Sequence, residues 1–196
     1  MLGTWTLPPE TVSVDALAAN LNVNLYGAVR LSNAVLPAMR AARGGRFIAT
    51  SSLAGLLGLP MLPLYASTKI ALEGYMESMA AAYAGIGIYF SIVAPGPVSS
   101  ALVANAAAPN EEAPAELRPA IEAFQHFMDD LVANSQSPDD CAEYFIKAAT
   151  DDRPQLRYMT YEPIHPKIRA KFVDLTGKKT LEVLKSMVVP RTETSS

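Results

Sequence analysis

Apolar residues recur at helical spacing over two long stretches of the chain. The first stretch predicts a helix from Ser13 to about Ala42, and its apolar positions are Val14, Leu17, Leu21, Leu25, Ala28, Leu31, Val35 and Met39. Ser13 can cap the start of this helix, and Gly44-Gly45 ends it. The second stretch predicts a helix from Leu64 to about Tyr83. Three asparagines inside the first helix are poor helix formers, which suggests that at least one has a role: Asn20, Asn22 and Asn24.

Two short apolar runs lie between and after these helices, and each predicts a buried strand. They are RFIATSS (46–52) and IYFSIVA (88–94), and a loop is predicted over 53–63. Helices that alternate with continuous apolar strands are typical of an α/β fold with a parallel sheet, whose strands are covered on both faces.

The second half of the chain continues the pattern less strongly. We expect a loop over 101–115, a helix over about 116–134 and a last strand over 156–160. Ser137-Pro138-Asp139-Asp140 is a strong helix start, with a cap, a proline at the first position and acids at the positive end. The apolar face expected for that helix consists of Cys141, Phe145, Ile146 and Ala149.

Composition narrows the class of protein. The 196 residues carry a net charge of −3 without a basic block, which argues against a nucleic-acid partner. The single cysteine, Cys141, cannot form an internal disulfide, so a reducing, cytoplasmic location is expected. Prolines and hydroxyl residues interrupt the most apolar stretch, 47–64, so no transmembrane segment is predicted. The first ten residues have no basic region and no long apolar run, so no signal peptide is predicted. We expect one domain over 1–190 and a polar tail over 191–196, and no metal site.

The segment YASTK (65–69) carries the candidate chemistry. Tyr65 and Lys69 are four residues apart, so on a helix they share a face. A phenol has a pKa of about 10, and a nearby ammonium lowers it toward the range where proton transfer is efficient. An ordinary surface pair remains the alternative from these two residues alone. However, Ser51-Ser52 and the turn Pro95–Val98 end the two predicted strands, and ligands bind at the carboxyl ends of such strands.

Five motifs together give the sequence a family resemblance. They are NVNLYGA (22–28), LPAMR (36–40), TSSLAG (50–55), YASTK with IALEG (65–74) and PGPVSS (95–100), with thirteen residues from Ser52 to Tyr65. In order and spacing they resemble the short-chain dehydrogenases/reductases. SLAGLLGLP, ALEGYMES, PQLRYMT and DLTGKK are similar to the branch of estradiol 17β-dehydrogenase type 1 and the photoreceptor-type retinol dehydrogenases.

The resemblance implies a role for each site residue. Tyr65 would be the general acid/base, Lys69 would lower its pKa and hold the nicotinamide ribose, and Ser52 would orient the substrate oxygen. Asn24 would hold a water that links Lys69 to solvent, although it could instead cap a bend in its helix. Besides Tyr65 and Lys69, the residues implied to contact an NADP or NAD cofactor are Pro95, Gly96, Val98 and Ser100.

The resemblance also implies a substrate and a fold. The substrate would be a hydrophobic alcohol or ketone of steroid or retinoid class, covered by a lid over 116–134; His126 in this lid is either a substrate contact or a surface histidine. The two long helices would form a homodimer interface. The expected fold is a partial doubly wound, Rossmann-type parallel sheet whose N-terminal strands are missing.

One expected motif is absent from the sequence. No G-x-G-x-x-G pattern, which would hold a dinucleotide pyrophosphate, occurs anywhere in the 196 residues. The expected alternative to an active enzyme is therefore a truncated, catalytically inactive product that acts, if at all, by associating with a partner. In either case the first predicted strand would leave an apolar sheet edge open to pairing.

Overall fold

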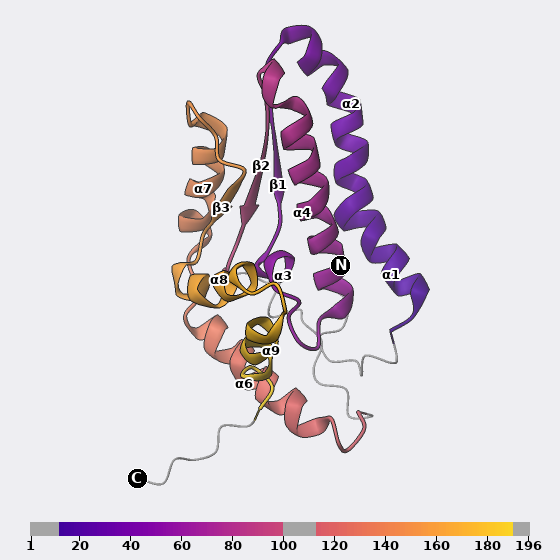
Figure 1. Cartoon of the computed structure of the whole chain (residues 1–196), viewed down its shortest axis with the longest axis vertical. Helices are drawn as coiled ribbons and strands as arrows, with labels where there is room; N and C mark the ends of the chain where they lie inside the picture. Colours follow the sequence, from indigo (N-terminus) through magenta and orange to yellow (C-terminus); the bar gives the residue numbers. More distant parts are fainter. Residues whose placement is uncertain (1–11, 100–112, 190–196) are drawn as a thin grey trace.

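Strands β1, β2 and β3 form a parallel sheet in that order (Figure 1). The computed structural model describes residues 12–99 and 113–189. The strands are β1 (Gly45–Thr50), β2 (Ile88–Ala94) and β3 (Arg157–Met159). β1 pairs with β2 from Gly45 opposite Ile88 to Thr50 opposite Val93. The predicted α/β class with a parallel sheet is confirmed.

The predicted helices are present, with two local differences. The helices before β2 are α1 (Val14–Leu21), a π-helical turn (Asn22–Tyr26), α2 (Gly27–Ala42), α3 (Leu53–Leu56), α4 (Pro63–Tyr83) and a 3₁₀ turn (Ala84–Ile86). After β2 come α6 (Arg118–Ala133), α7 (Pro138–Thr150), a 3₁₀ turn (Glu162–Ile164), α8 (His165–Val173) and α9 (Lys178–Lys185). The predicted first helix thus contains a π-helical turn, and the stretch predicted as a loop begins with the short α3.

Helices cover both faces of the sheet. Side chains along a strand alternate between the two faces, so each face has its own apolar side chains to bury. Helices α2 and α4 cover one face, where the core is formed by Leu36, Phe47, Ala49, Leu72, Met76, Ile88, Phe90 and Ile92. Helix α7 covers the other face (Figure 1). There Ile48 and Val93 pack with Ala148. Burial on both faces explains why β1 and β2 are continuous apolar runs.

The stripe of α7 that faces the sheet differs from the predicted one. Cys141 and Ala148 are buried and Phe145 packs on the sheet, but Ile146 is 55% exposed and Ala149 is exposed. Buried or packed positions follow the spacing 141, 144, 145, 148, which is one side of a helix. The predicted cap is present, since the Ser137 hydroxyl accepts from the Asp140 amide at 3.0 Å, and the Asp140 side chain completes a capping box.

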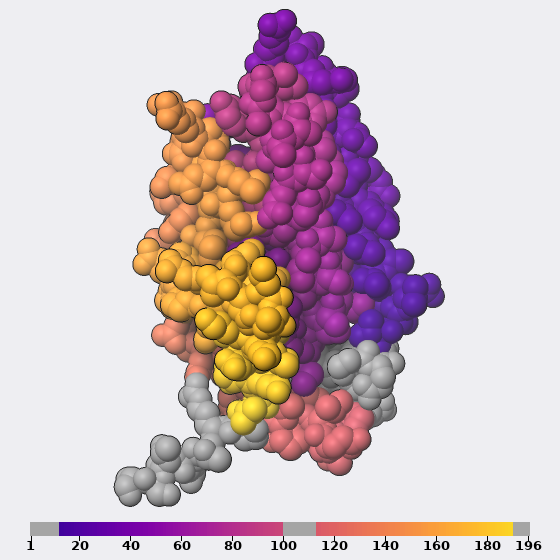
Figure 2. Space-filling model, in the orientation of Figure 1, coloured from indigo at the N-terminus to yellow at the C-terminus, as the bar shows by residue number. Residues whose placement is uncertain are grey.

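The C-terminal helices gather beyond the carboxyl ends of the strands. Ile164 and Ile168 pack on Leu56 and Leu57 after β1, and Met187 packs on Phe124 of α6. Figure 2 shows α8 and α9, in yellow, lying on the surface above α6. This end of the sheet is also where the sequence places the candidate site. Over residues 12–99 and 113–189, no helix has the length and hydrophobicity needed to cross a membrane.

Candidate active site

Tyr65, Lys69 and Ser52 meet at the carboxyl end of β1. Tyr65 and Lys69 lie in the first two turns of α4, on one face, and the Lys69 ammonium is 5.7 Å from the centre of the Tyr65 ring. The ammonium also donates a 2.9 Å hydrogen bond to the carbonyl of Thr50, the last residue of β1. Ser52 caps α3 by accepting from the Ala54 amide at 3.2 Å, and its hydroxyl interacts with the Tyr65 phenol. The Lys69 side chain is therefore hydrogen-bonded to β1, and the Tyr65 phenol interacts with Ser52, two residues after the end of that strand.

Burial opposes ionisation of both groups. It raises the pKa of Tyr65 above its usual value, and the hydrogen bond from the Ser52 hydroxyl acts in the opposite direction. Burial lowers the pKa of Lys69, and the charge of the Glu73 carboxylate opposes this shift. The pKa of the Tyr65 phenol is therefore raised, and not lowered as the sequence predicted from the neighbouring ammonium.

Asn24 contacts the same helix through a buried threonine. It lies in the π-helical turn, and its side-chain amide donates to the Thr68 hydroxyl at 3.0 Å. The Thr68 hydroxyl in turn donates to the Tyr65 carbonyl at 2.9 Å, and Thr68 is fully buried. π-helical turns are rare in proteins, and those that occur are frequently found at functional sites. This contact gives Asn24 a position beside the Tyr65–Lys69 turn, whereas its predicted role in holding a water stays a prediction.

The turn after β2 is anchored by two distant segments. The Gly96 amide donates to the Thr160 hydroxyl at 3.1 Å, and the Gln136 side chain donates to the same hydroxyl at 2.6 Å. Val98 forms a parallel bridge with Gln136. Pro95, Gly96 and Val98 are therefore held in a fixed turn at the same sheet edge as Tyr65. Ser100 falls outside the described residues.

Gly96 allows this turn to approach Tyr161. A Cβ atom at position 96 would stand 2.2 Å from the Tyr161 Cβ, which is attached to the backbone and cannot swing away. We expect Gly96→Ala to lower the free energy of unfolding by about 1–3 kcal/mol, as overpacking does. Urea denaturation checks this result.

Gly74→Ala is the matched control. Nothing lies within 4 Å of a Cβ at that helical position, so alanine there should raise stability by about 0.5–1 kcal/mol. Equal stability of Gly96→Ala and the unsubstituted chain would show that the close approach to Tyr161 is not maintained in solution.

His126 shares no cavity lining with Tyr65, Lys69 or Ser52 among the described residues. It is exposed on α6 and lines a cavity of about 400 Å³ between α6 and the end of α9, together with Glu122, Phe127 and Met187. The helix predicted over 116–134 is confirmed as α6, while its role as a lid remains a prediction.

Sequence reasoning missed four supporting residues: Thr68, Glu73, Gln136 and Thr160. Their partners, in the same order Asn24, Arg157, Thr160 and Gly96, lie far along the chain, so spacing in the sequence does not reveal the contacts. The one available signal was the position of Thr68 inside YASTK.

Comparison with known families identifies the motifs. A family model described as short chain dehydrogenase matches residues 3–111. Among curated proteins, the chain is 35% identical over 177 residues to 17-beta-hydroxysteroid dehydrogenase type 1 of Homo sapiens. The matched region covers 87% of this chain and 53% of that protein. It is 34% identical over 178 residues to retinol dehydrogenase 8 of Bos taurus, covering 87% and 57% respectively.

Solved structures share the fold. A short-chain dehydrogenase from Streptomyces avermitilis superposes with a TM-score of 0.72 at 26% identity, over 93% of this chain and 65% of that one. A short-chain dehydrogenase/reductase from Burkholderia phymatum, crystallised with NAD, gives a TM-score of 0.68 at 19% identity, over 96% and 65%. The chain spans slightly more than half the length of the curated relatives that it matches.

Proposed function

The chain belongs to the short-chain dehydrogenase family, and on that premise we propose that it is an NAD(P)-dependent oxidoreductase that interconverts a hydrophobic alcohol and its ketone or aldehyde. The observation that carries the proposal is the cluster of the Tyr65 phenol, the Ser52 hydroxyl and the Lys69 ammonium at the carboxyl end of β1. The names of the relatives support a substrate of steroid or retinoid class.

The residues of this chain supply proton transfer and orientation. Tyr65 gives a proton to the substrate oxygen during reduction and takes one during oxidation, and the Ser52 hydroxyl holds that oxygen by a hydrogen bond. The positive charge of Lys69 stabilises the phenolate form of Tyr65. Asn24 and Thr68 keep the turn of α4 that carries Tyr65 in place.

The site fits one half of a nicotinamide dinucleotide. An ammonium has three donors, of which the Thr50 carbonyl accepts one from Lys69, so donors remain for ribose hydroxyls. The fixed turn at Pro95, Gly96 and Val98 would hold the nicotinamide side. The cofactor, when bound, supplies the hydride. The sequence contains no glycine-rich motif for the pyrophosphate, so binding would rest on these residues.

A protein that associates without catalysis is the second candidate. It is favoured by β1, which pairs only with β2 among the described residues. An unpaired strand edge is a pairing site.

We further propose a homodimer through the two long helical segments, whose surfaces leave several apolar side chains exposed: Val14, Val23, Tyr26, Leu31 and Ile70.

Cofactor titration separates the two candidates. We expect the purified chain, shown to be folded by circular dichroism, to bind NADPH or NADH saturably in a calorimeter. With NADP⁺ or NAD⁺ as the hydride acceptor, we expect it to oxidise retinol or estradiol. Sedimentation of the same sample reports its oligomeric state. A folded chain that neither binds a dinucleotide nor turns over either alcohol would overturn the oxidoreductase proposal and leave the association protein.

A further inference from the structure

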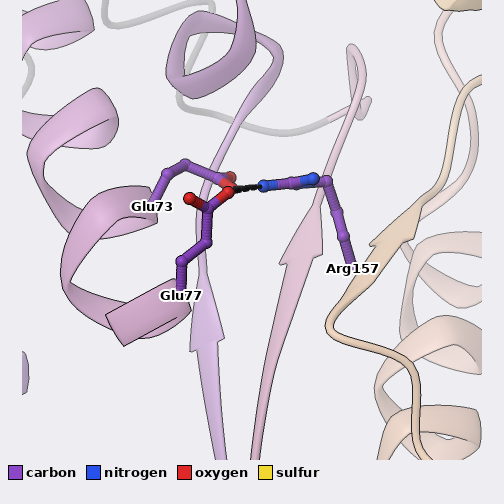
Figure 3. Close-up of polar contacts among 3 residues, drawn as sticks. All are labelled: Glu73, Glu77 and Arg157. Atoms are coloured by element: carbon purple, nitrogen blue, oxygen red, sulfur yellow. Dashed lines mark hydrogen bonds and ion pairs between the residues drawn. The ribbon is translucent and has the colours of Figure 1, made fainter. Parts of the chain in front are cut away.

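A buried carboxylate lies one helical turn beyond Lys69, and the proposed reaction leaves it unassigned. Glu73 is 5% exposed, and one of its oxygens accepts two hydrogen bonds from Arg157, at 2.9 Å from Nε and 2.6 Å from Nη2. Figure 3 shows Glu73 and Glu77 extending from α4 and Arg157 extending from β3 toward the same point. Glu77 also accepts from Arg157 at 2.8 Å, but its side chain is 52% exposed.

Glu73 is hydrogen-bonded to one cation, Arg157, and lies one helical turn from a second, Lys69. Residues 65, 69 and 73 follow one another at four-residue spacing along α4, so their side chains lie on one side of the helix. The Glu73 carboxylate acts on the Lys69 ammonium through its charge, and it is held from the sheet side by Arg157. Around the ammonium the structure further places the Tyr65 ring and the Thr50 carbonyl, both without charge.

The second oxygen of Glu73 shows that the carboxylate is not fully used by the ion pair that joins α4 to β3. Oε1 is buried and makes no hydrogen bond to the described residues, and the nearby Ser51 hydroxyl is in the same state. A Cβ at Gly55 would stand 2.4 Å from the Ser51 hydroxyl and 3.2 Å from the Glu73 Cγ, so Gly55 leaves room between them.

A buried ion pair is weak support for stability, since loss of hydration offsets the attraction. The pair with Arg157 therefore does not by itself account for a buried carboxylate at this position. Arg157 supplies the fixed anchor, because its guanidinium binds one Glu73 oxygen through two donors.

We propose that Glu73 is a positioning residue of the Tyr65–Lys69 site: held by Arg157, its carboxylate sets a negative charge one helical turn from the Lys69 ammonium and keeps that ammonium directed toward Thr50, beside the phenol. The inference rests on the proposed function for its catalytic meaning, but an effect of the Glu73 charge on Lys69 can be tested in the chain without cofactor or substrate. Through Arg157, Glu73 also links the active-site helix to the last strand, β3, by charge.

Trace acetylation of lysines tests the coupling without cofactor or substrate. Only the neutral amine reacts with acetic anhydride, so the pH midpoint of labelling follows the ionisation of each lysine, and mass spectrometry resolves Lys69 from the exposed reference Lys147. In E73Q we expect the Lys69 midpoint to move to lower pH. Below the midpoint, its labelling rate relative to Lys147 should rise at least about twofold, the effect of an exposed pair at this spacing.

E77Q is the matched control, because it also removes a carboxylate that contacts Arg157. Residue 77 is twice as far along the helix from Lys69 as residue 73. Its Lys69 midpoint should equal that of the unsubstituted chain. A folded E73Q with an unmoved midpoint overturns the proposal, and so does an equal shift in E77Q. Should E73Q fail to fold, E73D retracts the charge by one methylene; its midpoint should fall, and an unmoved midpoint is again contrary.

Activity provides a separate readout. Loss of the Glu73 charge makes Lys69 neutral at lower pH, so the Tyr65 phenolate forms less readily and the rise of kcat for alcohol oxidation moves to higher pH, with KM for the alcohol unchanged. A chain that never binds NADPH or NADH fails the proposed function while the labelling result still decides the coupling. An active chain with unmoved labelling in E73Q fails only the inference.

Discussion

Replacing Tyr65 with phenylalanine is expected to lower kcat/KM for retinol or estradiol oxidation by about 10²–10⁴-fold, the usual contribution of a positioned general acid or base. Phenylalanine keeps the ring and removes only the hydroxyl that interacts with Ser52. Dinucleotide affinity should change little, because the Lys69 ammonium and the turn at Gly96 remain. Steady-state kinetics and calorimetry measure the two effects.

Tyr89→Phe is the control for this change. Tyr89 is a partly exposed tyrosine of β2, and removing its hydroxyl should leave turnover and stability unchanged. If Tyr65→Phe retained full activity, the assignment of YASTK as the proton-transfer site would be wrong. If both variants lost activity equally, the loss would report on folding instead.

Phe90→Ala is expected to lower the free energy of unfolding by about 3–5 kcal/mol, the cost of truncating a buried phenylalanine. Phe90 is 3% exposed in the central strand, and its ring is 5.4 Å from that of Phe47 and 5.6 Å from that of Tyr83. A domain is stable by only about 5–15 kcal/mol, so this loss is a large part of the total. The change in the urea midpoint measures it.

The neighbouring residue gives a matched comparison. Tyr89→Ala removes an aromatic side chain of similar size from the next position of β2, where the side chain is 39% exposed. Tyr89→Ala should lower the free energy of unfolding clearly less than Phe90→Ala does. Equal costs would contradict the assignment of α2 and α4 to the face of the sheet that contains Phe90.

The elements of the fold were largely predictable because each one carries its own signal. IYFSIVA gave β2 with its observed bounds, and the Ser137 cap gave the start of α7. The π-helical turn was not predictable, since its residues continue the apolar spacing of a normal helix. Which stripe of α7 faces the sheet was also open, because Ile146 and Ala148 are adjacent apolar choices and only the position of the sheet selects one.

The candidate site divides in the same way. Ser52, Tyr65 and Lys69 all lie within residues 52–69, so their spacing in the sequence was enough to find them. The structure brings the three side chains together. The residues that hold them could not be found in this way. Asn24 meets Thr68 across 44 positions, Gly96 meets Thr160 across 64, and Glu73 meets Arg157 across 84.

The sequence by itself determined the alternation of helices and strands, the family and the residues available for chemistry, because periodicity and short motifs are local properties of the chain. Only the tertiary structure decided which groups surround that chemistry. Hydrogen bonds and charge interactions depend on distances of a few ångström between side chains, and packing of β3 beside β2 is what brings Arg157 to Glu73, one turn from Lys69.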